Sequence, residues 1–339
     1  MGALFVGVDG GGTSTRCVVV TESGEIAGRG RAGGANAISV PDPAANLRAA
    51  LLGALEGLDP ARVAGGVFGL AGAARAAESA ERAWREAGLA GRPGVVADVL
   101  VAFTGATDHP DGAVLVAGTG AIGARIRDRR IVRRADGLGW LLGDEGSGVW
   151  LGRRAAAAAL NAIDGRGAPT VLVARVAEAV LGPGAAGDDD GPALTQALVA
   201  AVYARVAESG PAWLGTLSPV LDAAAREGDE VARGIVAEAA RRLCRTARVV
   251  AGECDRGRGA RAEGGPDQAG GGPLVLAGSL LTEPTELAHL VRAELGRWAV
   301  LVRARDNAAG AAALAVRAAL PGDPRAAEAH RVLIGQEVA

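Results

Sequence analysis

The chain has no lysine, because all 36 of its basic residues are arginine. Without lysine it cannot form a lysine Schiff base with a carbonyl compound. It also lacks the lysine that a P-loop requires in GxxxxGK[ST] and the strand lysine of protein kinases. Both nucleotide-binding classes are therefore excluded unless a partner supplies the residue. An ATP site in this chain must hold phosphates with backbone N–H groups, hydroxyl groups and Mg²⁺.

Cysteine, long apolar runs and a surplus of basic charge are also lacking. Cys17, Cys244 and Cys254 are odd in number and show no metal-ligand spacing, which argues against a disulfide framework or a zinc site. The N-terminal residues do not resemble a secretory leader, and the formal net charge is only −2. We therefore expect a cytoplasmic protein that binds neither a membrane nor a nucleic acid.

The apolar runs that do occur are short and form two similar series. Each series predicts a strand, a glycine–threonine loop, a second strand, a tight turn and a third strand. The first series is Leu4–Val8, Arg16–Thr21 and Ile26–Arg29, and the second is Ala113–Val116, Gly123–Ile126 and Ile131–Arg134. Such a repeat in a chain of 339 residues predicts two related α/β domains that face each other.

The loop of the first series reads Asp9-Gly10-Gly11-Gly12-Thr13. Glycines let consecutive backbone N–H groups approach phosphate oxygens, and Thr13 adds a hydroxyl donor. Asp9 ends the strand and can hold Mg²⁺ through water, since this ion keeps most of its waters. The alternative is a hairpin turn in which the glycines only provide positive φ.

The loop of the second series is Gly118-Thr119-Gly120. A GTG sequence alone has little specificity. Its place in the repeat adds weight, because a nucleotide held between two domains needs a second phosphate loop opposite the first. A dinucleotide-binding fingerprint is excluded, because the first strand leads into a hairpin and GxGxxG is absent there.

A glycine-rich stretch from Gly137 to Gly148 contains two adjacent carboxylates, Asp144 and Glu145. So many glycines cost conformational order, and a closely approaching ligand would explain them. A helix cap at Ser147 is the simpler interpretation, and a helix cap and a bound ligand can occur together.

Three other segments give candidates or expectations. Asp98 directly follows a short apolar strand, where ligands of α/β sheets bind, and can accept a proton from a hydroxyl nucleophile. Capping of the following helix is the alternative for Asp98. Asp188-Asp189-Asp190 can bind a cation, but a solvated helix start fits its Gly/Pro-rich surroundings better. Arg256–Pro273 has almost no apolar residues and is expected to be a mobile surface insertion.

In their order along the chain, these segments resemble a known family. VDGGGT, then Asp98, GTG, GLGWLLGDEGS and finally LVLAGS are similar to the BadF/BadG-type ATPases, and within them to the N-acetylglucosamine kinases. The similarity extends from about Leu4 to Ala319. It implies an α/β actin-like ATPase (ribonuclease H-like) fold, with two similar domains and a nucleotide cleft between them. The implied units are an N-terminal sugar- and phosphate-binding domain at 1–110, a nucleotide-binding domain with a helical insertion at 111–320, and a tail or helix at 321–339.

The resemblance further implies an activity and roles for single residues. The implied reaction is transfer of the γ-phosphate of ATP, with Mg²⁺, to the 6-hydroxyl of N-acetylglucosamine, by a homodimer. Asp98 is the implied catalytic base and Asp9 the residue that holds the metal through water. The implied ATP contacts are Gly11, Gly12, Thr13, Gly118, Thr119, Gly120, Gly215, Gly278 and Thr282. The implied sugar contacts are Asn36, Asp98, Ala121, Ile122, Gly137, Leu138, Gly139 and Asp144.

Departures from the family pattern leave the exact sugar open. Ala121 and Ile122 stand where some relatives carry serine or asparagine, and Gly137-Leu138-Gly139 replaces a GWG segment. Glucosamine and N-acetylmuramic acid are therefore alternative substrates. A sugar-sensing protein without catalysis is another alternative, against which Asp98 argues. A dehydratase activator with a shared iron–sulfur cluster needs interface cysteines, whereas Cys17 is expected on an inner strand as a buried residue.

Overall fold

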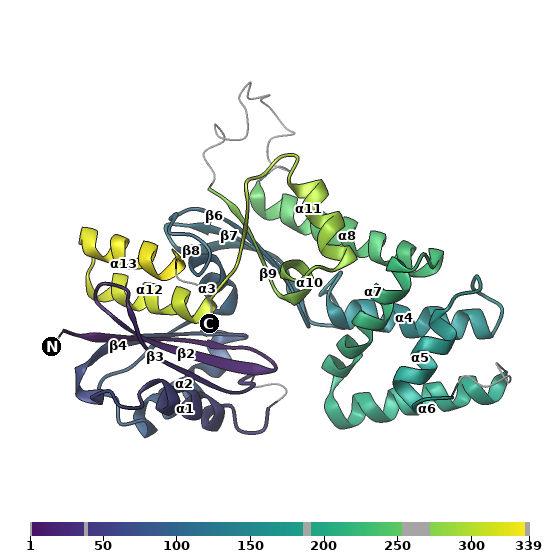
Figure 1. Cartoon of the computed structure of the whole chain (residues 1–339), viewed down its shortest axis with the longest axis horizontal. Coiled ribbons are helices and arrows are strands. Elements are labelled where there is room, and N and C mark those ends of the chain that lie inside the picture. Colours follow the sequence, from purple (N-terminus) through teal and green to yellow (C-terminus); the bar gives the residue numbers. More distant parts are fainter. Residues whose placement is uncertain (1, 37–39, 186–190, 253–271, 336–339) are drawn as a thin grey trace.

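The structure is a computed structural model that describes residues 2–36, 40–185, 191–252 and 272–335. Figure 1 shows two α/β parts side by side and a helical part that lies far from the N-terminus. Within the described ranges the first sheet holds five strands in the order β3-β2-β1-β4-β5. Strand β2 is antiparallel to β1 and β3, whereas β1, β4 and β5 are parallel to one another. The strands are β1 (Leu4–Gly10), β2 (Ser14–Thr21), β3 (Ile26–Gly33), β4 (Val63–Leu70) and β5 (Gly94–Ala97).

The second sheet repeats this topology. Among the residues described, its order is β8-β7-β6-β9-β10, with an antiparallel β6-β7-β8 meander followed by parallel β9 and β10. The strands are β6 (Gly112–Ala117), β7 (Ala121–Arg127), β8 (Arg130–Asp136), β9 (Leu274–Ala277) and β10 (Leu301–Arg303). The repeat and the α/β class that the sequence predicts are confirmed.

Local sequence explains how these strands run and turn. Every residue of β1 is buried except Asp9, which is partly exposed, as expected of an inner strand covered on both faces. The β7–β8 turn consists of Asp128 and Arg129, with φ of 47° and 54°. Two consecutive positive φ values are typical of a type I′ hairpin turn, so the tight turn expected here is confirmed.

Helices α1 (Pro43–Ala54) and α2 (Ala73–Glu86) cover one face of the first sheet. Helix α1 begins after Asp42, whose carboxylate accepts a hydrogen bond from the Ala45 N–H, and proline occupies its first turn. Both features favour a helix start. A short 3₁₀ turn, η1 (Pro60–Arg62), precedes β4.

The opposite face of the first sheet is covered by the C-terminal end of the chain. The alanine-rich helix α12 (Asn307–Ala319) packs on β1, β2 and β4, and α13 (Pro324–Gly335) packs on α12 (Figure 1). The approach is close, because a Cβ on Gly7 would lie 2.1 Å from the Ala308 carbonyl oxygen. The two helices thus cover the second apolar face of the first sheet, with α13 outside α12. How the chain divides into domains stays a prediction.

Helices α3 (Asp98–Thr104) and α12 form the layer between the two sheets. The apolar side of α3 packs on the second sheet, and its other side packs on α12. Gly310 allows this crossing, because a Cβ there would lie 2.3 Å from the Val101 carbonyl oxygen. Thr104 Oγ1 donates a hydrogen bond to the Gly310 carbonyl oxygen over 3.0 Å. Helix α3, which begins at Asp98, is thereby held between the two sheets.

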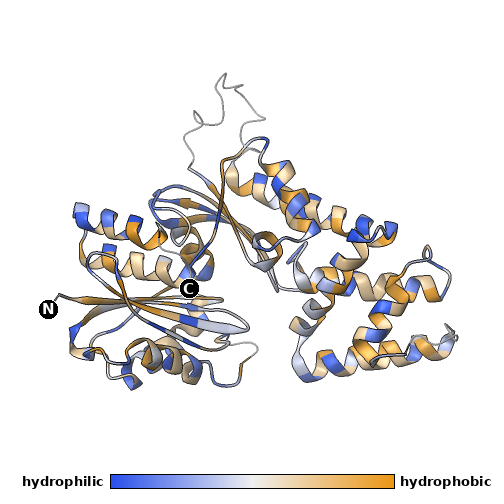
Figure 2. Cartoon of the chain, in the orientation of Figure 1, coloured by the Kyte–Doolittle hydropathy of each residue, from blue (hydrophilic) through white to orange (hydrophobic). Residues whose placement is uncertain are grey.

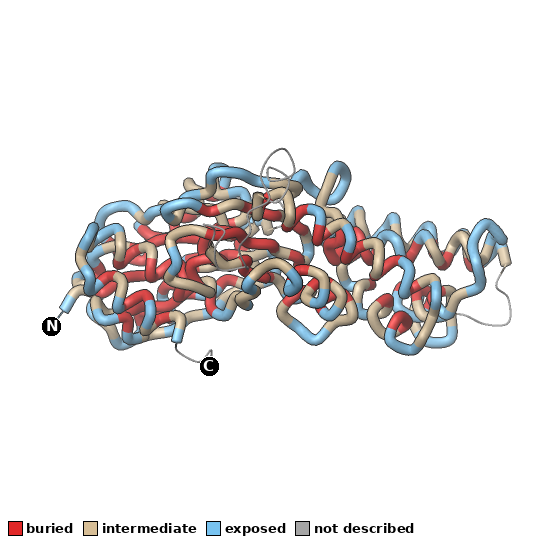
Figure 3. Tube along the Cα trace, turned by 90° about the horizontal axis from the view of Figure 1, so that it is seen from above, coloured by how far each residue is buried: buried red, intermediate tan, exposed pale blue. Residues whose placement is uncertain are grey.

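The remaining helices cover the second sheet or extend away from it. Helices α8 and α11 pack together on its outer side, and α4 to α7 form the helical part, so the mostly helical segment expected after Ser147 is confirmed. Figure 2 shows hydrophobic strands in both sheets, and Figure 3 shows buried residues running along the middle of an elongated molecule. These elements are α4 (Gly148–Ile163), α5 (Leu172–Leu181), α6 (Pro192–Ser209), η2 (Pro211–Leu217), α7 (Ser218–Arg226), α8 (Glu230–Ala251), α10 (Ser279–Thr282) and α11 (Glu286–Leu295).

Some expectations fall outside the described residues. The first concerns Asp188–Asp190, for which a cation site or a helix start was predicted. The second is the mobile insertion predicted at Arg256–Pro273, of which only Gly272 and Pro273 are described. Cys254 also lies outside the described residues. Cys17 and Cys244 are both buried, and neither forms a disulfide. Cys17 lies on β2 between two other strands, which confirms its predicted place on an inner strand.

Candidate active site

The first glycine loop connects β1 to β2 at the end of the first sheet. Its Gly11 N–H donates to the Ser14 carbonyl oxygen over 3.0 Å, and the Ala35 N–H donates to the Gly11 carbonyl oxygen over 2.9 Å. Thr13 at the tip is exposed. The second bond holds the segment after β3, and with it Asn36, beside the loop. The first phosphate loop and Asn36, predicted from separate parts of the sequence, are therefore neighbours.

The second glycine loop connects β6 to β7 in the same way. Here the Gly118 N–H donates to the Gly120 carbonyl oxygen over 2.9 Å, and Thr119 at the tip is exposed. The start of α4 is tied to this loop, because the Gly148 N–H donates to the Gly118 carbonyl oxygen over 2.8 Å. Ser147 caps α4 by accepting from the Trp150 N–H over 3.1 Å, which confirms the cap predicted for it.

The other predicted ATP residues gather around the second loop. A Cβ on Gly118 would lie 4.0 Å from Gly278 Cα, and a Cβ on Gly148 would lie 3.6 Å from Gly215 Cα. Gly278 has a φ of 85°, and Thr282 Oγ1 donates to its carbonyl oxygen over 3.0 Å. A cavity of about 400 Å³ lies next to these residues. Its lining includes Ser218, Asp222, Ser279, Leu280 and Glu283.

Two carboxylates and an amide meet between the sheets. Asp9 ends β1, Asp98 begins α3, and Asn307 begins α12. Asn307 Nδ2 donates to Asp9 Oδ2 over 3.3 Å, and the Val99 N–H donates to Asp98 Oδ1 over 2.9 Å. Sequence reasoning missed Asn307. The signal was present, because Asn307 follows a short strand and opens a helix, just as Asp98 does.

Burial and mutual repulsion shift the pKa values of these carboxyl groups. Loss of solvent raises the pKa of Asp9 to about 7, and the negative charge of Asp98 adds to the rise. The Arg16 charge and the Asn307 hydrogen bond oppose it. Burial likewise raises the pKa of Asp98, whereas the Val99 N–H and the Arg134 charge lower it. Raised pKa values of this kind are typical of proton-transfer and ligand sites.

Six of the eight predicted sugar residues lie together at the edge of the second sheet. Ala121 and Ile122 open β7, and Ile122 pairs with Asp136 at the end of β8. Backbone hydrogen bonds from Ala121 and Gly139 lower the pKa of the Asp144 carboxyl, although burial raises it more. Gly137 and Leu138 directly follow Asp136 in the chain, and both are exposed. The structure therefore brings these six residues together, whereas Asp98 begins α3 between the sheets and Asn36 lies beside the first glycine loop.

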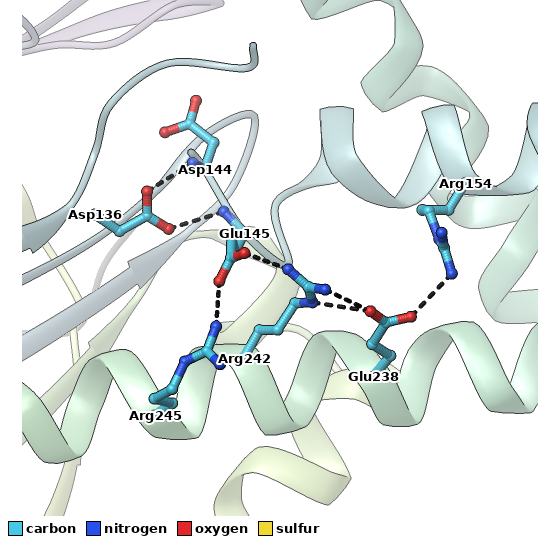
Figure 4. A network of polar contacts seen from close by, with 7 residues as sticks. All are labelled: Asp136, Asp144, Glu145, Arg154, Glu238, Arg242 and Arg245. Carbon is cyan, nitrogen blue, oxygen red and sulfur yellow. Dashed lines mark hydrogen bonds and ion pairs between the residues drawn. The ribbon is translucent and has the colours of Figure 1, made fainter. Parts of the chain in front are cut away.

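The adjacent carboxylates Asp144 and Glu145 have separate surroundings. Figure 4 shows their side chains pointing in opposite directions. Asp144 faces the second glycine loop, because a Cβ on Gly120 would lie 3.0 Å from Asp144 Oδ2. Glu145 faces α8, where its carboxylate is paired with Arg242 and Arg245. Only Asp144 is placed to contact a ligand beside the loop.

The surroundings of Asp9 suit a cation. The described residues contain no group of three metal-ligating side chains, so a metal here would rest on few protein ligands. Asp9 and Asp98 nevertheless repel each other strongly enough to help raise the pKa of Asp9. A divalent cation held through water would relieve that repulsion, and Mg²⁺ takes few carboxylates and keeps its waters.

No helix in the described part of the chain is both long and apolar enough to cross a membrane.

The chain is similar to known proteins over most of its length. Residues 6–300 match the model of the BadF/BadG/BcrA/BcrD ATPase family. An N-acetylmuramic acid/N-acetylglucosamine kinase of Clostridium acetobutylicum is 36% identical over 88 residues, which cover 26% of this chain and 29% of that relative. The chain thus matches less than a third of that protein's length.

Two solved structures share the fold over nearly the whole chain. A proposed N-acetylglucosamine kinase from Chromobacterium violaceum superposes with a TM-score of 0.68 at 25% identity, over 92% of this chain and 99% of that one. A ROK family glucokinase from Streptomyces griseus, in complex with glucose and AMPPNP, gives a TM-score of 0.53 at 21% identity, over 92% and 99%. The fold is the actin-like ATPase fold, with two similar α/β domains, and the chain belongs to the BadF/BadG/BcrA/BcrD ATPase family.

Proposed function

We propose that this protein is an ATP-dependent aminosugar kinase that transfers the γ-phosphate to the 6-hydroxyl of N-acetylglucosamine. The single observation that carries the proposal is the position of Asp98. Its carboxylate opens α3 between the two sheets, beside Asp9 and the first glycine loop, and remains partly exposed. The names of the relatives from Clostridium acetobutylicum and Chromobacterium violaceum support the choice of sugar.

In the proposed reaction the sugar hydroxyl attacks the γ-phosphorus of ATP. A new O–P bond forms as the bond to the bridging oxygen of ADP breaks, and the hydroxyl proton passes to a carboxylate oxygen of Asp98. The raised pKa of Asp98 makes it a better proton acceptor than an ordinary carboxylate, and the Val99 N–H and the Arg134 charge oppose the rise. Backbone N–H groups of the two glycine loops, with the Thr13 and Thr119 hydroxyls, would hold the phosphates.

The remaining predicted residues receive roles that fit their places. Asp9 would hold Mg²⁺ through water, and the bound cation would offset charge on the transferring phosphoryl group. The cavity beside Gly215, Gly278 and Thr282 has a size that suits a nucleoside, so we place adenosine there. Asn36 and Asp144 would bind sugar hydroxyls from opposite sides, with Ala121, Ile122 and Gly137–Gly139 along the pocket.

N-acetylmuramic acid is the second candidate substrate. It is named first in the relative from Clostridium acetobutylicum, and its lactyl group needs space beside the sugar. Leu138 replaces the bulkier tryptophan of the GWG pattern and is 66% exposed, which leaves such space at the pocket rim.

The test is a coupled assay of ADP release with ATP and Mg²⁺ against N-acetylglucosamine, N-acetylmuramic acid, glucosamine, N-acetylmannosamine and glucose. We expect sugar-dependent release that is fastest with N-acetylglucosamine, and a product phosphorylated at the 6-position by NMR. Preference for N-acetylmuramic acid would favour the second candidate. ADP release that no sugar increases would contradict the kinase proposal and favour a sugar-sensing role.

A further inference from the structure

The loop that presents Asp144 is held by a carboxylate for which the family resemblance implies no role. Asp136 ends β8, and its Oδ1 accepts a hydrogen bond from the Asp144 N–H over 2.7 Å. Its Oδ2 accepts from the Glu145 N–H over 2.8 Å. Both carboxylate oxygens are thus used to hold two consecutive N–H groups eight and nine residues further along the chain. Figure 4 shows Asp136 facing this backbone from the sheet side.

The loop between these residues is tightly closed around the same carboxylate. The Gly143 N–H donates to the Gly139 carbonyl oxygen over 2.8 Å. A Cβ on Gly143 would lie 2.3 Å from Asp136 Oδ1, so only glycine lets the loop settle on the carboxylate. Asp144 has a φ of 53°, a left-handed conformation that costs free energy for a non-glycine residue. Two charge-assisted hydrogen bonds from adjacent N–H groups are strong enough to hold it.

The geometry points to Asp136 as a positioning residue for sugar binding: its carboxylate fixes the left-handed backbone of Asp144 and so holds the Asp144 carboxylate beside Gly120. This inference rests on the proposed function, in which Asp144 binds a sugar hydroxyl. Asp136 touches neither sugar nor nucleotide in this scheme. It acts through the backbone that carries Asp144.

Glu145 ties the other end of the loop to the helices. Its carboxylate is paired with Arg242 and, over 2.7 Å, with Arg245, both on α8. Arg242 also bonds Glu238 over 2.6 Å (Figure 4). In addition, Arg242 Cζ lies 5.4 Å from the centroid of the Trp150 ring on α4. Asp136 on the sheet and this network on the helices therefore hold the Asp144–Glu145 backbone from both sides.

The charge of Asp136 gives this role an expected effect on the pH dependence of sugar binding. Burial raises the pKa of the Asp144 carboxyl most, and the charge of Asp136 raises it further, against hydrogen bonds from Ala121 and Gly139. Asp136→Asn removes the charge, so the Asp144 pKa must fall. The acid limb of kcat/KM for the sugar should then move to lower pH. Loosening of the fold would change the sugar KM and the ATP KM together, which separates it from this role.

The kinetic test compares Asp136→Asn with Asp128→Asn, the same change at the exposed turn of the same hairpin. In Asp136→Asn one acceptor is replaced by an NH₂ group, so we expect the sugar KM to rise about tenfold or more while the ATP KM stays within about twofold. We expect Asp128→Asn to leave all constants unchanged. An unchanged sugar KM in Asp136→Asn, or equal rises in both KM values, would overturn the assignment.

A second measurement separates this inference from the proposed function. Hydrogen exchange of the Asp144 and Glu145 amides needs no substrate, and we expect it to be about tenfold faster in Asp136→Ala than in the wild type or Asp128→Asn. Equal exchange rates would show that Asp136 does not hold this backbone, whatever the protein phosphorylates. Faster exchange in a protein that phosphorylates no sugar would instead overturn the proposed function and the role of Asp136 in sugar binding. The hydrogen bonds from Asp144 and Glu145 to Asp136 would still stand.

Discussion

Asn307 donates a hydrogen bond from Nδ2 to Asp9 Oδ2 over 3.3 Å, although the two residues are 298 positions apart in the chain. The contact joins the end of β1 to the start of α12, on the side of the first glycine loop. It also favours the ionised form of Asp9, because an amide donor stabilises a carboxylate. The last part of the chain thus takes part in a site whose other residues come mainly from its first half.

Removing the Asn307 amide should shift the pH dependence of activity. Its hydrogen bond lowers the Asp9 pKa, which burial has already raised to about 7, so in Asn307→Ala that pKa should rise further. Asp9 must be ionised to hold Mg²⁺, and we therefore expect less activity at pH 7, largely restored at about pH 8.5, when the carboxylate is ionised again. The measurement is a pH–rate profile of ADP release. Asn161→Ala on α4 is the matched control, and an acid limb equal to that of the wild type would exclude the role of Asn307.

Asp98→Asn should abolish proton transfer but keep substrate binding. If Asp98 is the base, kcat should fall on the order of 10²–10⁴-fold while the sugar KM changes little. Stopped assays and calorimetric binding of the sugar separate the two effects. Glu78→Gln on the exposed side of α2 serves as the control for loss of a carboxylate. Undiminished turnover in Asp98→Asn would remove Asp98 from the mechanism.

Asp9→Asn should increase thermal stability at high pH. The folded protein holds the Asp9 proton with a pKa of about 7, against 3.8 for an ordinary aspartate. The wild type therefore keeps the stability of the protonated form below pH 3.8 and loses it as the pH rises to about 7. Asparagine avoids this loss, so its Tm advantage should be absent at pH 4 and present at pH 8, measured without Mg²⁺ or nucleotide. A Tm difference that does not depend on pH would contradict the raised pKa.

Gly310→Ala should destabilise the layer between the sheets. The new Cβ would lie 2.3 Å from the Val101 carbonyl oxygen, which forces α3 and α12 apart at a cost of about 1–3 kcal/mol in the free energy of unfolding. Gly234→Ala in α8 is a matched helical control with nothing within 4 Å of the new Cβ, and it should stabilise by about 0.5–1 kcal/mol. Chemical denaturation measures both, and opposite signs are expected. Equal effects in the two variants would exclude the close crossing of α3 and α12.

The local sequence was sufficient for much of the fold and part of the site. Apolar alternation and turn residues predicted the strands, and the same order repeated along the chain predicted two sheets of one topology. Both glycine loops were found because each follows the first strand of one of the two similar series. Asp98 was found because it directly follows a short apolar strand, where ligands of α/β sheets bind. All these signals lie within a few neighbouring residues.

Other features depend on contacts between distant segments. The alanine-rich sequence of α12 predicts a helix but not which sheet it covers, since small residues pack closely against many surfaces. In the same way, Asp144 and Glu145 are equivalent in the sequence, and their separate surroundings are decided by Asp136 on one side and Arg242 on the other.

The sequence by itself determined the element types, the repeat, the two loops and the absence of a lysine-based nucleotide site, because these follow from residue types and their spacing. The tertiary structure alone decided that Asn307 meets Asp9, that α12 returns to the first sheet, and which of the paired carboxylates faces the second glycine loop. Contacts across 298 positions depend on how the two sheets enclose α3 and α12, and no local pattern encodes that arrangement.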